Sequence, residues 1–213
     1  MKYKSYVVFG LGKFGQAVVD KLIETGADVM VVDNDEETIE AYSSKVTVAV
    51  ATDLTDADNI KALGISNIDC AIVAMGMSLE ASIMCVMVSK ECGVSQVVAK
   101  AGSKRMGDIL EKIGADEIVY PEEESGIRTA RRLLSSDFLE FFEIDEDTCI
   151  VEMKPKQEWI GKSLKELNLR KKYGINILSL NKGKIKGNVD PDEILTSDYT
   201  LLVMGNKKQI DRF

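Results

Sequence analysis

The sequence predicts an α/β protein: a Rossmann-like, doubly wound parallel sheet, followed by a linker helix and a small α+β domain. Over residues 1 to about 120, short β-branched runs alternate with helical patterns, which is typical of a parallel sheet with crossover helices. The first run leads into three glycines spaced G-x-G-x-x-G, namely Gly10, Gly12 and Gly15. From Cys149 on, the pattern changes to strands with hairpin signals.

The first part of the chain carries apolar runs that we expect to form the parallel sheet. These six strands are residues 5–9, 28–32, 46–50, 70–74, 96–99 and 117–120. Between the last two, Met106, Ile109, Leu110 and Ile113 fall at i, i+3, i+4 and i+7, on one face of a helix. The helix expected after Ser78 is apolar on nearly every side, so it needs cover on more than one side, by the core or by a dimer partner.

Two helical pieces, residues 125–134 and 138–142, are expected to link the sheet to the rest of the chain. The stretch DFLEFFEI holds three of the six phenylalanines, a density typical of a packed interface; a hinge packed on its own domain is the alternative. We therefore expect two domains, residues 1–142 and residues 143–213. The second should contain a helix near residues 163–167, a hairpin around residues 181–184, a strand at residues 200–204 and a last amphipathic piece from residue 206.

Composition excludes several classes of function. The net charge of −8 disfavours nucleic acid or an anionic membrane as the main partner, although residues 154–187 hold ten Lys or Arg against two acids. Histidine is absent, which excludes any reaction that needs an imidazole. No apolar run approaches the roughly 20 residues of a membrane-spanning helix, and no signal peptide is recognisable. The four cysteines form no C-x-x-C pair, so we expect a cytoplasmic chain with reduced thiols.

The glycine pattern predicts a nucleotide site. Gly10 allows a tight turn, Gly12 lets the backbone approach a pyrophosphate, and Gly15 lets the helix pack closely on the strand. The free N–H groups at the start of that helix suit phosphates. Asp33 ends the second run and suits ribose hydroxyls, which disfavours NADP. Asp35 either assists at the ribose or caps the following helix.

Groups for redox chemistry are missing beside this site. Hydride transfer needs a proton donor or acceptor, which enzymes supply with His or a Tyr–Lys pair. The chain has no His, and no tyrosine is followed by Lys four positions later. We therefore favour a sensor, in which ligand binding shifts the population of conformations, over the alternative of a small NAD-dependent oxidoreductase.

Several segments together resemble the cytosolic regulatory subunits of Trk/Ktr-type potassium transporters, the RCK (KTN) family. They are VVFGLGKFG, VVDNDEE, ATDLTD, ALGISNIDCAIVAMG, VVAKA, LEKIGADEIVYPEEESG and LLVMGNKKQIDRF. The resemblance covers essentially the whole chain. It implies an RCK_N nucleotide-binding domain and an RCK_C regulatory domain, without enzymatic activity. It also implies homodimers that assemble into a homo-octameric ring on the inner face of the membrane, bound to an integral-membrane potassium-translocating subunit.

The resemblance also implies ligands and site residues. Exchange of ATP for ADP, or of NADH for NAD in some members, changes the shape of the ring. Lys13 stands where members often have Arg, which reaches the neighbouring subunit's nucleotide; lysine keeps the charge but loses the bidentate fork. The residues expected at the nucleotide are Gly10, Gly12, Lys13, Phe14, Gly15, Asp33, Asn34, Asp35, Asp53, Ala74, Gly76 and Lys100.

Two further sites follow from the resemblance. Glu122 matches a carboxylate that joins a divalent cation, such as Mg²⁺, to the triphosphate at the dimer interface. The alternative is that Glu122 belongs to the acidic first turn of the next helix. In RCK_C, cyclic di-AMP would meet Asn168, Arg170, Ile177 and Pro191, whereas a solvated basic face is the alternative there. A second-messenger binding protein without a membrane partner is a further alternative for the whole chain.

Overall fold

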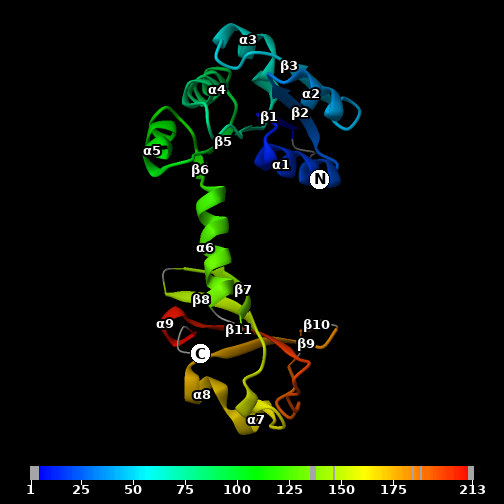
Figure 1. Ribbon diagram of the computed structural model, residues 1–213, viewed down its shortest axis with the longest axis vertical. Helices are drawn as coiled ribbons and strands as arrows, with labels where there is room; N and C mark the ends of the chain where they lie inside the picture. Colours follow the sequence, from blue (N-terminus) through cyan, green and yellow to red (C-terminus); the bar gives the residue numbers. More distant parts are fainter. Residues whose placement is uncertain (1–4, 135–137, 146, 184, 188, 211–213) are drawn as a thin grey trace. The chain divides into compact units, whose positions relative to one another are not determined.

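The protein is described by a computed structural model that covers residues 5–134, 138–145, 147–183, 185–187 and 189–210 (Figure 1). The chain divides into two compact units, Met1–Glu124 and Ser125–Phe213. This division falls earlier in the chain than the expected boundary after residue 142. The reason is that the backbone of residues 138–143 pairs with the second sheet rather than with the first.

The first unit is a parallel sheet of six strands in the order β3-β2-β1-β4-β5-β6. Its strands are β1 (Ser5–Phe9), β2 (Asp28–Asp33), β3 (Val48–Ala51), β4 (Cys70–Val73), β5 (Gln96–Lys100) and β6 (Glu117–Val119). All six lie within two residues of their expected bounds. Because the strand order reverses between β1 and β4, a crevice is expected where the carboxyl ends of these two strands diverge.

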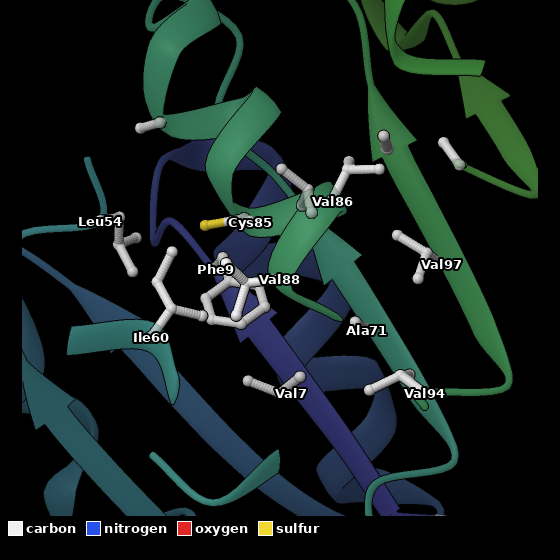
Figure 2. Close-up of a cluster of buried hydrophobic side chains, with 14 of the residues drawn as sticks. Val7, Phe9, Leu54, Ile60, Ala71, Cys85, Val86, Val88, Val94 and Val97 are labelled. Carbon is white, nitrogen blue, oxygen red and sulfur yellow. The ribbon is translucent and has the colours of Figure 1, made fainter. Parts of the chain in front are cut away.

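Helices cover both faces of this sheet. They are α1 (Lys13–Glu24), α2 (Glu36–Ser43), α3 (Ala57–Ala62), α4 (Leu79–Glu91) and α5 (Lys104–Lys112). Val7 and Phe9 of β1 pack in one cluster with residues of α3, α4 and α5 (Figure 2). Val8, between them, packs in another cluster with Val19 of α1 and Ile39 of α2. The expected doubly wound sheet is therefore confirmed.

The helix α4 buries only part of its apolar surface in this core. Ala81, Cys85 and Val88 are buried, whereas Leu79 and Met87 are 40% and 36% exposed. The core therefore buries one side of α4, as expected, and part of its apolar surface stays exposed.

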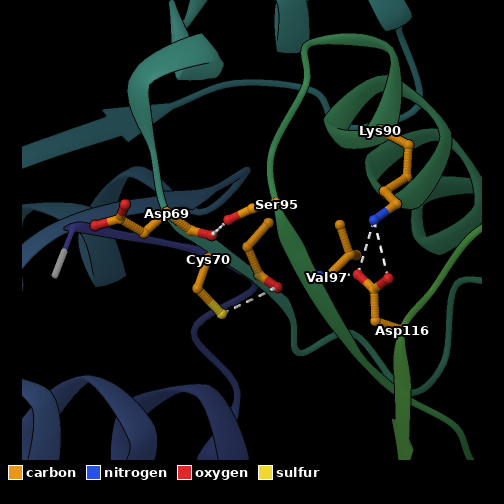
Figure 3. A network of polar contacts seen from close by, with 7 residues as sticks. Asp69, Cys70, Lys90, Ser95, Val97 and Asp116 are labelled. Carbon is orange, nitrogen blue, oxygen red and sulfur yellow. Dashed lines mark hydrogen bonds and ion pairs between the residues drawn. The ribbon is translucent and has the colours of Figure 1, made fainter.

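Polar contacts tie neighbouring strands together at their amino ends (Figure 3). The Asp116 carboxylate, just before β6, accepts hydrogen bonds from the Lys90 ammonium at 2.8 Å and from the Val97 amide at 2.6 Å. The Ser95 hydroxyl donates to the Asp69 carbonyl oxygen at 2.7 Å. The amino ends of these strands are thus held together by structural contacts. A ligand site is therefore expected at the carboxyl ends.

The second unit is an antiparallel sheet in the order β10-β9-β11-β8-β7. Its strands are β7 (Phe138–Glu143), β8 (Thr148–Met153), β9 (Asn176–Asn181), β10 (Ile185–Lys186) and β11 (Thr200–Asn206). Short helices α7 (Leu164–Leu167), α8 (Leu169–Tyr173) and α9 (Lys207–Ile210) accompany it, with a 3-10 turn η2 (Gln157–Trp159). Trp159, Ile175 and Leu201 lie fully inside its core. The expected α+β domain, including the β9–β10 hairpin, is confirmed.

One of the two expected linker helices is wrong. The first is α6 (Pro121–Leu134), which contains the expected residues 125–134. Residues 138–142, expected as helix, lie in the strand β7, because their backbone pairs antiparallel with β8. Of the three phenylalanines there, only the Phe142 side chain is described, and it is 53% exposed.

Candidate functional site

A cavity of about 530 Å³ lies at the carboxyl ends of the parallel strands. We call it the glycine-loop cavity. It gathers most of the residues expected at a nucleotide, from the ends of β1 to β5 and the start of α6. These are Gly10, Gly12, Lys13, Phe14, Asp33, Asn34, Asp53, Ala74, Gly76 and Lys100. Glu122, expected at the divalent cation, lines the cavity as well. Of the expected residues, Gly15 and Asp35 do not line it.

Gly10 and Gly15 shape the loop by their lack of a side chain. Gly10 has φ +94°, and a Cβ there would lie 2.6 Å from Met75 Cγ. A Cβ on Gly15 would lie 2.0 Å from the Gly10 carbonyl oxygen and 3.2 Å from Ala74 Cβ. Gly15 therefore lets α1 pack directly against the loop, which is the packing role expected for the third glycine.

Gly12 is different, because the protein's own packing does not require a glycine there. Its φ of −63° is open to any residue, and a Cβ would meet nothing within 4 Å. Gly12 is the N-cap of α1, and glycine has no side chain that could cap this helix end. The first turn of α1 contains no acid, and its first residue is Lys13. Free N–H groups and a cation thus meet at the cavity wall, an arrangement that suits an anion.

The Asp33 carboxylate at the end of β2 stabilises the loop from the side. It accepts hydrogen bonds from the Leu11 amide at 2.5 Å and from the Asp35 amide at 3.0 Å. Asp35 itself caps α2, since its carboxylate accepts from the Thr38 hydroxyl at 2.9 Å and the Glu37 amide at 3.0 Å. The hydrogen bond from the Thr38 hydroxyl lowers the pKa of Asp35 most, followed by those from the backbone amides. Of the two alternatives for Asp35, the structure therefore supports the helix cap.

Asp53 lies at the rim of the cavity, in the turn after β3. Its carboxylate accepts hydrogen bonds from the Thr55 amide at 2.9 Å and the Thr55 hydroxyl at 2.8 Å. The backbone hydrogen bond from Thr55 is the larger cause that lowers the pKa of Asp53. The turn thus holds the Asp53 carboxylate in a fixed position, at the same carboxyl end of the sheet as Asp33.

Lys100 and Glu122 form an ion pair in the cavity, with 2.5 Å between Nζ and Oε1. The Lys100 side chain is only 13% exposed, whereas that of Glu122 is 69% exposed. The ammonium also lies 5.8 Å from the centre of the Phe14 ring. A Cβ on Gly76 would lie 3.0 Å from Lys100 Cε, so a small residue there leaves room for this lysine. The hydrogen bond from Lys100 is the main cause that lowers the pKa of Glu122.

The cavity by itself offers little to a metal ion. Glu122 is the second residue of α6. It is therefore also part of the acidic first turn of this helix, which was the alternative to a metal ligand. Within the described ranges, no group of three or more Cys, Asp or Glu side chains is placed to hold a metal. A cation at Glu122 would therefore need other oxygens, such as those of a bound phosphate.

Comparisons with known proteins decide the family. The TrkA-N domain model matches residues 6–121, and the TrkA-C domain model matches residues 150–213. The chain is 37% identical over 212 residues to the Ktr system potassium uptake protein C of Bacillus subtilis, covering 99% of this chain and 96% of that protein. The chain belongs to the RCK family.

Other relatives agree with this RCK assignment. The Ktr system potassium uptake protein A of Bacillus subtilis is 35% identical over 214 residues, which is 100% of this chain and 96% of that protein. The crystal structure of the GsuK RCK domain has the same fold, with a TM-score of 0.65 and 17% identity, over 99% of this chain and 46% of that chain. The GsuK channel bound to NAD gives a TM-score of 0.64 at 17% identity, over 98% of this chain and 38% of that chain. Because the chain belongs to this family, the expectation of a regulatory protein is confirmed over the alternative of an oxidoreductase.

The RCK chain has no described helix that combines the length and the apolar character needed to cross a membrane.

A second cavity of about 550 Å³ lies in the C-terminal unit of this RCK chain. It brings together all four residues expected for cyclic di-AMP, Asn168, Arg170, Ile177 and Pro191, and we call it the Asn168 cavity. Asn168 adopts the left-handed conformation with φ 45°, between α7 and α8. Leu169 adds an apolar wall, and Lys165 adds a second cation.

Sequence reasoning missed several residues of the glycine-loop cavity. Thr55, Met77 and Ser78 line it without having been expected. Ser78 had a signal, because a serine before an apolar helical run is typical of an N-cap, and its hydroxyl accepts from the Ala81 amide. Thr55 had a weaker signal, the turn-forming sequence Asp53-Leu54-Thr55. Nothing in the sequence marks Met77, whose side chain is fully exposed.

Proposed function

We propose that this chain is the nucleotide-responsive regulatory subunit of a Ktr-type potassium uptake system, and that an adenine nucleotide binds in the glycine-loop cavity. The observation that carries the proposal is Gly12: an uncapped helix end with open space before it, beside Lys13 and Lys100. ATP or ADP fits these two cations best. NAD(H) is the alternative, and the GsuK channel of similar fold has been described bound to NAD.

The Lys100–Glu122 pair supplies a response to the ligand's charge. In the free chain, the carboxylate of Glu122 neutralises the nearly buried ammonium of Lys100. Phosphate oxygens in the cavity would compete for that ammonium and release Glu122. The released carboxylate would then hold a divalent cation together with the phosphates, and that cation would neutralise part of their charge. Because Glu122 lies in the first turn of α6, the exchange acts on the helix where the two units divide.

The proposed assembly follows from the family. Homodimers would form a homo-octameric ring, attached at the inner face of the cell membrane to an integral-membrane potassium-translocating subunit. Lys13 is exposed at the cavity wall, where it would reach the neighbouring subunit's nucleotide. A lysine makes a single-point contact with a phosphate, so discrimination between ATP and ADP should be weaker than with Arg.

The proposed function is tested by potassium flux. The chain and its membrane-spanning partner are reconstituted together in liposomes, and potassium uptake is measured with ATP, ADP, NAD or NADH. We expect uptake to change by several-fold between two of these nucleotides. Uptake that is the same with every nucleotide, and the same without the chain, would contradict the proposal. A partner that does not copurify with the chain would favour the stand-alone second-messenger binding protein.

The Glu122→Gln variant tests the charge exchange. Removing the carboxylate frees Lys100, so nucleotide affinity without a divalent cation should rise about two- to fivefold, the worth of a partly exposed ion pair. The gain in affinity on adding Mg²⁺ should disappear. Calorimetric titrations of ATP with and without Mg²⁺ measure both effects. Glu123→Gln, also exposed in the first turn of α6 but outside the cavity lining, is the matched control. An unchanged effect of Mg²⁺ in Glu122→Gln would contradict the role of this residue.

The Asn168 cavity is the second proposed ligand site, for cyclic di-AMP. Its mixture of cations and apolar walls suits two phosphates and an adenine. Arg170→Gln should weaken binding of cyclic di-AMP by about tenfold, since one charge-assisted hydrogen bond is lost. Lys162→Gln, exposed and outside this cavity, should leave the affinity unchanged. Calorimetry with the natural chain is the first measurement, and a chain that does not bind cyclic di-AMP would remove this part of the proposal.

A further inference from the structure

A third cavity, of about 460 Å³, lies in the C-terminal unit and has a different character. Its wall comes from three segments that are distant in sequence: Lys156 before η2, residues 170–174 in and after α8, and Gln209 of α9. Of the seven described residues that line it, four are cations: Lys156, Arg170, Lys171 and Lys172. We call it the basic pocket. Among the described residues, no aliphatic side chain lines it, in contrast to the Asn168 cavity.

Three cations of the basic pocket have no acidic partner in the part of the chain that the structure describes. No ion pair or hydrogen bond joins the side chains of Arg170, Lys171 or Lys172 to a described carboxylate. Elsewhere in the same unit, lysines do have such partners. Examples are Lys182 with Asp198 at 2.9 Å and Lys207 with Glu143 at 3.6 Å. Positive charge is therefore concentrated at the pocket.

The pocket also has a fixed polar wall. Gly174 ends α8 with φ 70°, and a Cβ there would lie 2.6 Å from Gln209 Oε1. The amide of Gln209 thus lies directly over Gly174, beside the cations, where its NH₂ group is available as a donor. Tyr173, which also lines the pocket, donates its hydroxyl hydrogen to Glu158 at 3.1 Å.

A purely structural explanation accounts for only part of this arrangement. Cations in the last turn of α8 favour its carbonyl groups. That effect does not involve Lys156, whose ammonium lies 6.0 Å from the centre of the Trp159 ring, and it does not need the approach of Gln209. The convergence of these groups on one hollow is better explained by a ligand.

We propose that the basic pocket binds a compact group of clustered phosphates, carried either by a soluble polyphosphate or by an anionic lipid headgroup. Several cations around a small hollow suit a high density of negative charge. Among the described lining residues of the basic pocket, cations outnumber the single aromatic residue, Tyr173, so charge dominates this pocket and its ligand differs from that of the Asn168 cavity. The proposal does not depend on the function proposed for the glycine-loop cavity.

The test uses the full chain and two probes. Sodium tripolyphosphate, measured by calorimetry, represents the soluble source. Flotation with vesicles of phosphatidylcholine and cardiolipin, compared with phosphatidylcholine alone, represents the lipid source. Each protein is also prepared with the additional substitution Gly12→Asp. This substitution places a carboxylate at the glycine loop and blocks phosphate binding there, so the tripolyphosphate that still binds is bound elsewhere. Binding of tripolyphosphate alone supports a soluble ligand, and binding of cardiolipin vesicles supports a lipid headgroup.

The double variant Lys171→Gln/Lys172→Gln should bind tripolyphosphate or cardiolipin vesicles, whichever the natural chain binds, more weakly. We expect a loss of about tenfold in affinity for each lost charge-assisted contact. Arg170 is left intact because it also lines the Asn168 cavity. Lys154→Gln/Lys162→Gln removes the same charge from exposed positions outside the pocket, and should change the affinity less than about threefold. Equal weakening by the two double variants, or no binding of either probe, would overturn the proposal.

Discussion

The Gly12→Asp variant is expected to remain as stable as the natural chain and to lose nucleotide binding. Aspartate at an N-cap accepts hydrogen bonds from the first turn, and it is at least as favourable there as glycine. The position has open space and a φ of −63°, so the side chain enters without strain. The same carboxylate occupies the place of the phosphates and takes up the free N–H groups. We expect ATP affinity to fall by about 100-fold, the worth of two charge-assisted hydrogen bonds.

Gly12→Asn separates charge from size in this prediction. Asparagine has nearly the same shape and also caps helices, but it brings no negative charge. Its ATP affinity should lie between that of the natural chain and that of Gly12→Asp. Thermal unfolding monitored by circular dichroism, together with calorimetry, measures both properties. If Gly12→Asp bound ATP with unchanged affinity, the phosphates would not lie at the start of α1.

The Gly15→Ala variant should have the opposite outcome, a loss of stability. Its Cβ would lie 2.0 Å from the Gly10 carbonyl oxygen, a backbone atom that cannot move without distorting the loop. Overpacking of this kind costs about 3 kcal/mol in the free energy of unfolding when the backbone has to shift. Urea unfolding of the two chains gives the difference.

Gly126→Ala is the matched control for Gly15→Ala. Gly126 also lies in a helix, α6, but a Cβ there would meet nothing within 4 Å. Since alanine favours helix over glycine by about 1 kcal/mol, this variant should be as stable as the natural chain or slightly more so. Equal stability of Gly15→Ala and Gly126→Ala would show that α1 does not pack on the loop as described.

The sheet could be predicted because its central strands carry apolar side chains that are buried on both faces. All four residues of β4 are buried, so Cys70–Val73 belongs to an unbroken apolar run that begins directly after Asp69. Residues 138–142 could not be predicted in the same way. A short apolar run fits a helix or a strand equally well, and only the pairing with β8, ten residues further on, makes it a strand.

The candidate site also has some features that the sequence predicts and others that only the fold brings together. The glycine spacing and Asp33 are local patterns, and the structure brings them to one cavity. The contact between Lys100 and Glu122 is not local, because it depends on β5 and β6 lying side by side. The two readings of Asp35 could be separated only by distances. The basic pocket needed the fold as well, since Lys156 and Gln209 stand far apart in the chain.

The central claim is that this chain binds an adenine nucleotide through its glycine loop, and calorimetric titration tests it most directly. The full chain is titrated with ATP, ADP, NAD and NADH, with and without Mg²⁺. The account predicts saturable binding of ATP or ADP, with one site per chain, that Gly12→Asp removes. Binding of NAD or NADH alone would contradict the roles proposed for Lys13 and Glu122. A folded chain that binds none of the four nucleotides would contradict the claim itself.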